Sequence, residues 1–114
     1  MDTESLGILT QLRKGVLDHC VLALLRDEPG YGLDLAARLG QHQVLFASEG
    51  TLYPLLSRLR RQGWVESSWQ ESPAGPPRRY YTLTDAGSAA LARFTAAWQP
   101  FADDVRAVLA QEEE

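Results

Sequence analysis

Apolar residues recur at helical spacing along much of this chain, and one stretch shows the pattern most clearly. Between positions 48 and 61, Leu52, Leu55, Leu56 and Leu59 fall at i, i+3, i+4 and i+7, which predicts a helix with one buried side. The outer side has hydroxyl, aromatic and cationic groups and no carboxylate: Thr51, Tyr53, Ser57, Arg58, Arg60 and Arg61. Such a helix has the chemistry to enter a DNA major groove. From the helix alone, a solvated basic face is the other interpretation.

Two helices are predicted ahead of this one, mainly as scaffold. The first has a broad apolar face over residues 9–25 and stops at Asp-Glu-Pro-Gly, residues 27–30. The second runs from about Tyr31 or Gly32 to Leu39, with Gly40 as its terminator. Lys14, near the start of the first helix, either contacts a backbone phosphate or is merely solvated.

The ends and the interior of the third helix carry their own signals. Ser48 is predicted to be its N-cap, with Glu49 in the favourable first turn. Gly63 is predicted to close the helix in a left-handed conformation. Pro54 removes one backbone N–H inside the helix, so we expect a local bend there, with Gly50 absorbing it.

A β-hairpin is predicted directly after this helix, from strand candidates at residues 64–70 and 78–83. Residues 70–77 hold three prolines and a glycine, which predicts a long, proline-stiffened loop between the strands. Arg78 and Arg79 stand at the base of the hairpin, and one of them points outward in either register. Helix, tight turn and cationic hairpin predict a winged helix-turn-helix. An ordinary hairpin that covers a core is the alternative.

The last predicted helix begins after the hairpin, with Thr84 as its N-cap. Its apolar residues alternate at spacings of three and four, a heptad-like seam: Leu91, Phe94, Trp98, Phe101, Val105 and Val108. The seam is too long for a small winged domain to bury, so a second copy of the chain is the predicted partner. Pro100 is expected to kink the helix near Ala96. The predicted fold is mainly α with a small β-hairpin.

Several motifs together resemble the PadR family of bacterial transcriptional regulators. They are Glu-Gly-Thr-Leu-Tyr-Pro-Leu-Leu-Ser-Arg-Leu at 49–59, Arg-Tyr-Tyr-Thr-Leu-Thr-Asp-Ala-Gly at 79–87, the helix at 17–25 and Gly-Tyr-Gly-Leu-Asp-Leu at 30–35. The similarity covers residues 12–109, and the short tail is similar to the smaller PadR subgroup, in which one C-terminal helix forms the dimer. The resemblance implies the fold, a dimer and operator binding, but neither the operator nor the effector.

The resemblance also bears on the aromatic residues of the last helix. In some short PadR regulators, aromatics in this helix line a pore between subunits that takes flat aromatic compounds. This implies an effector site at Phe94, Trp98 and Phe101. The alternative is that Trp98 is an aromatic of the dimer core, because aromatic stripes at helical spacing are usually packing.

Composition agrees with one compact domain inside the cell. The chain has 114 residues, of which 45% are hydrophobic, and its lone cysteine, Cys20, suits a reducing cytosol. The opening Met-Asp-Thr-Glu is not a secretion signal, and the longest mostly apolar stretch, residues 16–25, is too short to span a bilayer. We therefore expect a cytoplasmic protein that does not bind a membrane.

The formal charge of −4 is the main objection to DNA binding, and the distribution of charge answers most of it. Residues 48–82 carry five arginines against three glutamates. Residues 83–114 carry two arginines against six acidic residues. Positive charge is therefore concentrated on the predicted third helix and hairpin.

An enzyme is not predicted. The two histidines and one cysteine make no metal cluster, no phosphate-binding glycine loop is present, and adjacent His19 and Cys20 are a poor nucleophile–base pair.

We predict a transcriptional regulator, a repressor without cofactor, that binds a palindromic operator as a homodimer. Residues 1–83 would be the DNA-binding domain and 84–114 the dimerisation helix. A winged-helix protein-interaction module is the alternative. The predicted DNA contacts are Lys14, Ser48, Thr51, Tyr53, Ser57, Arg58, Arg61, Arg78 and Arg79.

Overall fold

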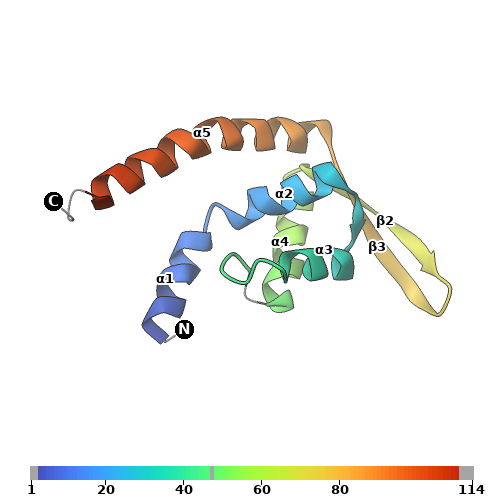
Figure 1. The fold of residues 1–114 in the computed structure, drawn as a ribbon. Helices are drawn as coiled ribbons and strands as arrows, with labels where there is room; N and C mark the ends of the chain where they lie inside the picture. The colour runs from blue at the N-terminus through green and yellow to red at the C-terminus, as the bar shows by residue number, and fades with distance from the viewer. Residues whose placement is uncertain (1–2, 47, 111–114) are drawn as a thin grey trace.

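The computed structural model describes residues 3–46 and 48–110, which form helices and, at one side of them, a small antiparallel sheet (Figure 1). In chain order the elements are α1 (Thr3–Arg13), α2 (Leu17–Asp27), β1 (Gly30–Tyr31), α3 (Gly32–Leu39), α4 (Glu49–Arg61), β2 (Val65–Ser72), β3 (Gly75–Leu83) and α5 (Asp85–Ala110). The first part of α5 lies over α2, and its second half projects away from the β2–β3 hairpin (Figure 1). The molecule is therefore elongated, with extents of 60 × 34 × 21 Å.

The core lies where α2, α3 and α4 meet the base of the sheet. Leu52, Leu55, Leu56 and Leu59 of α4 are all buried, which confirms the predicted stripe. They pack with leucines of α2 and α3, with Val65 and Tyr81 of the sheet, and with Ala90 and Leu91 of α5. The predicted class, mainly α with a winged helix-turn-helix and a long last helix, is confirmed.

The single first helix that we predicted over residues 9–25 is wrong, because the chain breaks there into α1 and α2. Gly15 lies between them with φ +78°, in the left-handed region that glycine enters without strain. The consequence is that Ile8 and Leu12 of α1 are about two-thirds exposed, at 60% and 64%. Only the α2 part of the apolar face enters the core.

The hairpin differs from the prediction at its tip. The long loop expected over residues 70–77 is wrong: the strands extend further, and only Pro73 and Ala74 form the turn. The pairing is irregular between Gln70 and Ser72 on β2, and the stretch of β3 opposite this irregularity contains Pro76 and Pro77. Prolines fit a strand at such a bulge because no ladder hydrogen bond is required of them there.

The sequence pattern did not predict a third strand, β1. Its two residues pair antiparallel with β3, Gly30 with Tyr81 and Tyr31 with Tyr80, which gives the order β1-β3-β2. Two residues are too few to show an alternating pattern. This strand joins the start of α3 to the hairpin.

The junction of α4, the sheet and α5 is tightly bonded. As predicted, Gly63 ends α4 with φ +77°, and the N–H groups of Gly63 and Trp64 donate to Arg60 O and Leu59 O in a Schellman motif. Thr84 caps α5, as predicted, because its Oγ1 accepts from the Gly87 N–H at 3.0 Å. The same hydroxyl donates to Gly63 O at 2.7 Å. The end of α4 and the start of α5 are therefore held together.

The two helices with an internal proline both continue beyond it. Pro54 lies inside α4 and Pro100 inside α5. The bend at Pro54 and the kink near Ala96 stay predictions. None of the helices in the described ranges is both long and apolar enough to cross a membrane.

Candidate nucleic-acid interface

The outer face of α4 forms the centre of the candidate interface. At 100° per residue, Gly50, Pro54, Ser57 and Arg61 lie opposite the buried leucines, and all but half-buried Ser57 are exposed. Tyr53 lies on the flank toward the hairpin. Thr51 and Arg58 lie on the opposite flank, toward the turn between α1 and α2, and both are exposed. The helix thus presents hydroxyl, aromatic and cationic groups along one open side.

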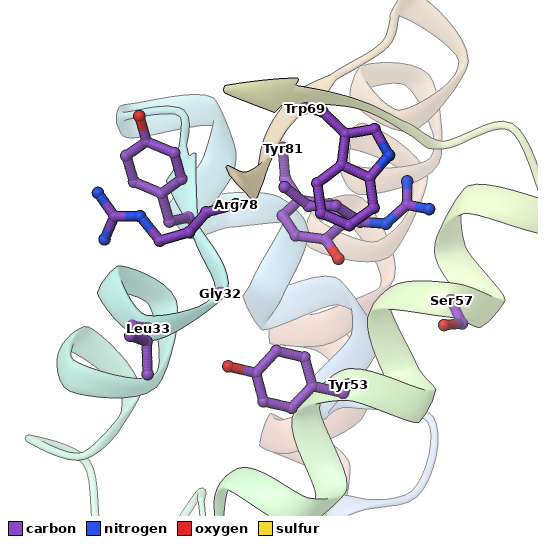
Figure 2. Close-up of a pocket in the computed structure, with 9 residues that line it drawn as sticks. Gly32, Leu33, Tyr53, Ser57, Trp69, Arg78 and Tyr81 are labelled. Atoms are coloured by element: carbon purple, nitrogen blue, oxygen red, sulfur yellow. The ribbon is translucent and has the colours of Figure 1, made fainter. Parts of the chain in front are cut away.

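Between α4 and the hairpin lies a hollow of about 380 Å³, the wing-side hollow (Figure 2). Figure 2 shows Trp69 and Tyr81 of the hairpin facing Tyr53 of α4, with Leu33 of α3 to one side. Its lining residues are Tyr31, Gly32, Leu33, Tyr53, Ser57, Trp69, Arg78, Arg79 and Tyr81. Aromatic rings and two guanidinium groups therefore lie beside α4.

The two arginines of the hairpin both rest on aromatic rings. Arg79 lies 4.5 Å from the ring centre of Trp69, its cross-strand neighbour, and donates to Ser67 Oγ at 2.7 Å. Arg78 lies 4.2 Å from the ring centre of Tyr31. Such cation–π contacts orient the guanidinium groups and leave their remaining N–H donors available. Arg78 is exposed and Arg79 is half-buried.

Two further residues shape the wing-side hollow. A β-carbon at Gly32 would come within 2.7 Å of the Tyr53 ring, so this ring would have to shift. The Tyr53 side chain therefore packs directly against the start of α3. Burial raises the pKa of the Tyr81 hydroxyl, although nearby Arg79 and Arg60 act in the opposite direction. Tyr81 thus stays neutral at physiological pH and adds no negative charge to this surface.

On the other flank of α4 lies a second hollow of about 490 Å³, the α2-side hollow. It is lined by Thr10, Arg13, Lys14, Gly15, Leu17, Asp18, Thr51, Leu55 and Arg58. Arg58 is not free there: its Nη2 and Nε donate to the two carboxylate oxygens of Asp18, at 2.8 and 3.3 Å. The sequence analysis missed Asp18, because the two residues are 40 positions apart and no local pattern links them.

Two more residues near this hollow have structural partners. Arg13 Nε donates to the Val44 carbonyl oxygen at 3.0 Å, which ties the end of α1 to the loop before α4. Ser48 occupies the N-cap position, as predicted, but its hydroxyl makes no capping bond and instead lies 3.3 Å from Thr51 Oγ1. Lys14 is exposed at the rim of the hollow.

The aromatic residues of α5 form a stepwise stack. The Phe94 ring stacks on His19 of α2 at 4.4 Å, Trp98 follows at 5.8 Å from Phe94, and Phe101 lies 6.4 Å from Trp98. Trp98 is 41% exposed and Phe101 is 63% exposed. His19 thereby anchors one end of the stack to the winged domain, and the other end is open.

The predicted seam of α5 divides into two parts. Val105 and Val108, like Trp98 and Phe101, are exposed in the single chain. Leu91 is buried in the core of its own chain, which leaves it little exposed surface, and its assignment to the dimer interface stays a prediction. No group of histidine, cysteine and carboxylate side chains in residues 3–46 and 48–110 is arranged to hold a metal ion.

Comparisons with known proteins agree with this geometry. Residues 21–93 match the family described as the transcriptional regulator PadR-like family. A PadR-like transcription factor from Bacteroides fragilis is 39% identical, covers 90% of this chain and 98% of its own, and has a TM-score of 0.74. A PadR-like regulator from Bacillus cereus is 37% identical, with coverages of 87% and 96% and a TM-score of 0.76. A PadR family regulator from Eggerthella lenta is 38% identical, with coverages of 90% and 89% and a TM-score of 0.79.

Proposed function

This chain belongs to the PadR-like family of transcriptional regulators, and we propose that it binds a palindromic operator as a homodimer and represses transcription. Family membership makes it a DNA-binding regulator and not an enzyme. The proposal covers four further properties: the symmetry of the operator, the homodimer, repression as the sign of regulation, and a cytoplasmic location of the protein.

One observation carries the DNA-binding part of the proposal: the open face of α4 lies between two cationic flanks. Arg78 and Arg79 line the wing-side hollow, and Lys14 and Arg58 line the α2-side hollow. In the proposed complex, α4 enters the major groove, with Thr51, Tyr53, Ser57 and Arg58 near base edges. Backbone phosphates are contacted by the remaining predicted residues: Lys14, Ser48, Arg61, Arg78 and Arg79.

The homodimer part of the proposal is supported by the apolar surface of α5 and α1. The projecting half of α5 carries a row of exposed apolar side chains: Trp98, Phe101, Val105 and Val108. Ile8 and Leu12 of α1 are exposed as well. A row of exposed apolar side chains is typical of an interface between protein chains. We place the twofold axis of the dimer along this part of α5.

The effector part of the proposal rests on the open end of the aromatic stack. A planar, hydrophobic molecule beside Trp98 would extend the stacking of Phe94 on Trp98, next to the tilted ring of Phe101. Because Thr84 bonds the start of α5 to Gly63 at the end of α4, a change in α5 reaches the recognition helix. A ligand shifts DNA binding only if its affinity differs between the competent and incompetent dimers.

Selection of duplexes from a random library by the purified full-length protein tests the proposal. We expect enrichment of an inverted repeat with half-sites about one helical turn apart. The Arg58→Ala/Arg79→Ala variant should then bind the selected duplex more weakly. If Arg58 contacts a guanine, the loss of Arg58 alone should reduce the binding free energy by about 1–3 kcal/mol. Arg93→Ala/Arg106→Ala, with the same charge change on α5, serves as the matched control. Lack of any enriched sequence would favour the protein-interaction module.

A further inference from the structure

The ion pair between Asp18 and Arg58 joins α2 to α4 at the edge of the DNA-binding surface. Both carboxylate oxygens are engaged, at 2.8 and 3.3 Å from the guanidinium nitrogens. The side chain of Asp18 is 21% exposed, whereas that of Arg58 is 47% exposed. The Asp18 carboxylate is therefore the less exposed partner, and the Arg58 guanidinium is the one that can move away into solvent.

The surroundings of the pair make Asp18 unusual. Among the residues that line the α2-side hollow, Asp18 is the one carboxylate, and the cations are Arg13, Lys14 and Arg58. Arg13 is already bonded to the Val44 carbonyl oxygen. An acid placed against a DNA-facing arginine lowers the positive charge offered to any duplex, so its presence opposes binding.

We propose that Asp18 is a specificity-determining residue, which withholds Arg58 from DNA unless a base edge replaces the carboxylate. Guanine offers two acceptors, O6 and N7, that match both N–H donors now given to Asp18. A pair this exposed is weak enough to be exchanged. At a sequence without a suitably placed guanine, Arg58 stays on Asp18 and adds nothing to affinity. This inference rests on the proposed placement of α4 in the major groove.

Asp18→Asn tests the inference, because asparagine keeps the shape and removes the charge. The probe is a fluorescein-labelled duplex of mixed sequence, compared with a duplex selected by the wild-type protein. Affinity for the mixed duplex should rise about 1.5- to 5-fold per subunit. The slope of log affinity against log salt for the mixed duplex should become steeper by about 0.9 per subunit, because Arg58 now neutralises a phosphate. Affinity for the selected duplex should rise less, so the ratio between the two duplexes falls.

Two controls separate release of Arg58 from simple removal of a negative charge. Glu49→Gln removes one carboxylate from the start of α4, where it forms no ion pair within the described residues. It should leave the ratio between duplexes unchanged. In an Arg58→Gln background, Asp18→Asn should lose its effect on the salt dependence, as a double-mutant cycle requires. Thermal unfolding of every variant checks that the fold persists, and Asp18→Ser replaces any Asn variant that does not fold.

The outcomes distinguish this inference from the proposed function. If Arg58→Gln weakens binding but Asp18→Asn behaves like Glu49→Gln, the inference is overturned and the DNA contact of Arg58 stands. If Arg58→Gln leaves the affinity for both duplexes unchanged, Arg58 does not contact DNA, and the inference fails with that part of the proposed function.

Discussion

Arg79 is the cation of the hairpin with the most defined position, because Trp69 supports its face and Ser67 accepts one of its hydrogens. A preorganised guanidinium loses little side-chain entropy when it meets a phosphate. Arg79→Ala should therefore weaken binding to all duplexes alike and lower the magnitude of the salt slope by about one unit per subunit. Fluorescence anisotropy at several salt concentrations measures both quantities. Arg93→Ala, the same change on α5, should alter neither. A sequence-dependent loss would mean that Arg79 reads bases.

Gly87 fixes how closely α5 approaches the sheet. A β-carbon at this position would collide with the Trp64 carbonyl oxygen and with the Leu83 side chain. Gly87→Ala should therefore lower the free energy of unfolding by about 1–3 kcal/mol, the usual cost of overpacking. Urea denaturation measures the change. Its neighbour Ser88 is exposed, so Ser88→Ala should stay within about 0.5 kcal/mol of wild type. Equal stabilities would show that α5 has room to shift.

At the scale of elements, the local sequence pattern is sufficient to predict a helix where the apolar periodicity spans the whole helix. The leucine stripe of α4 and the terminating Gly63 were predictable, since each signal lies within a few neighbouring residues. The break at Gly15 carries the same kind of local signal as Gly63, a glycine just after basic residues, but the apolar spacing that continues across it favoured one long helix. The contact of Asp18 with Arg58 and the pairing of β1 depend on the folded arrangement, which no local pattern contains.

The aromatic stack gives α5 a measurable property of its own. We expect a planar hydrophobic dye to quench tryptophan fluorescence by stacking at Trp98, and to weaken binding of the selected duplex. Trp64 and Trp69 also emit, so the informative result is the loss of quenching in Trp98→Ala. Trp69→Phe is the matched control and should keep the quenching. If the dye binds Trp98→Ala as well as wild type, and DNA affinity is unaffected, Trp98 serves packing alone.

At the scale of the whole molecule, the projecting half of α5 predicts a dimer. Full-length protein should sediment as a dimer at micromolar concentration, with its recognition helices about 34–36 Å apart when bound to DNA. Phe101→Asp should shift sedimentation toward monomer, because it places a charge in the apolar row. Thr95→Asp on the same helix is a control of equal charge outside that row. A wild-type monomer at this concentration would contradict the proposed assembly.

The salt dependence of binding to the selected duplex tests the central claim, DNA binding by α4 and its two cationic flanks, most directly. A dimer that neutralises six or more phosphates should give a slope of log affinity against log salt of about −5 or steeper. The Arg78→Ala/Arg79→Ala variant should reduce the magnitude of that slope by about two units per subunit. A slope near zero in the wild-type protein, or one that this variant leaves unchanged, would contradict the account.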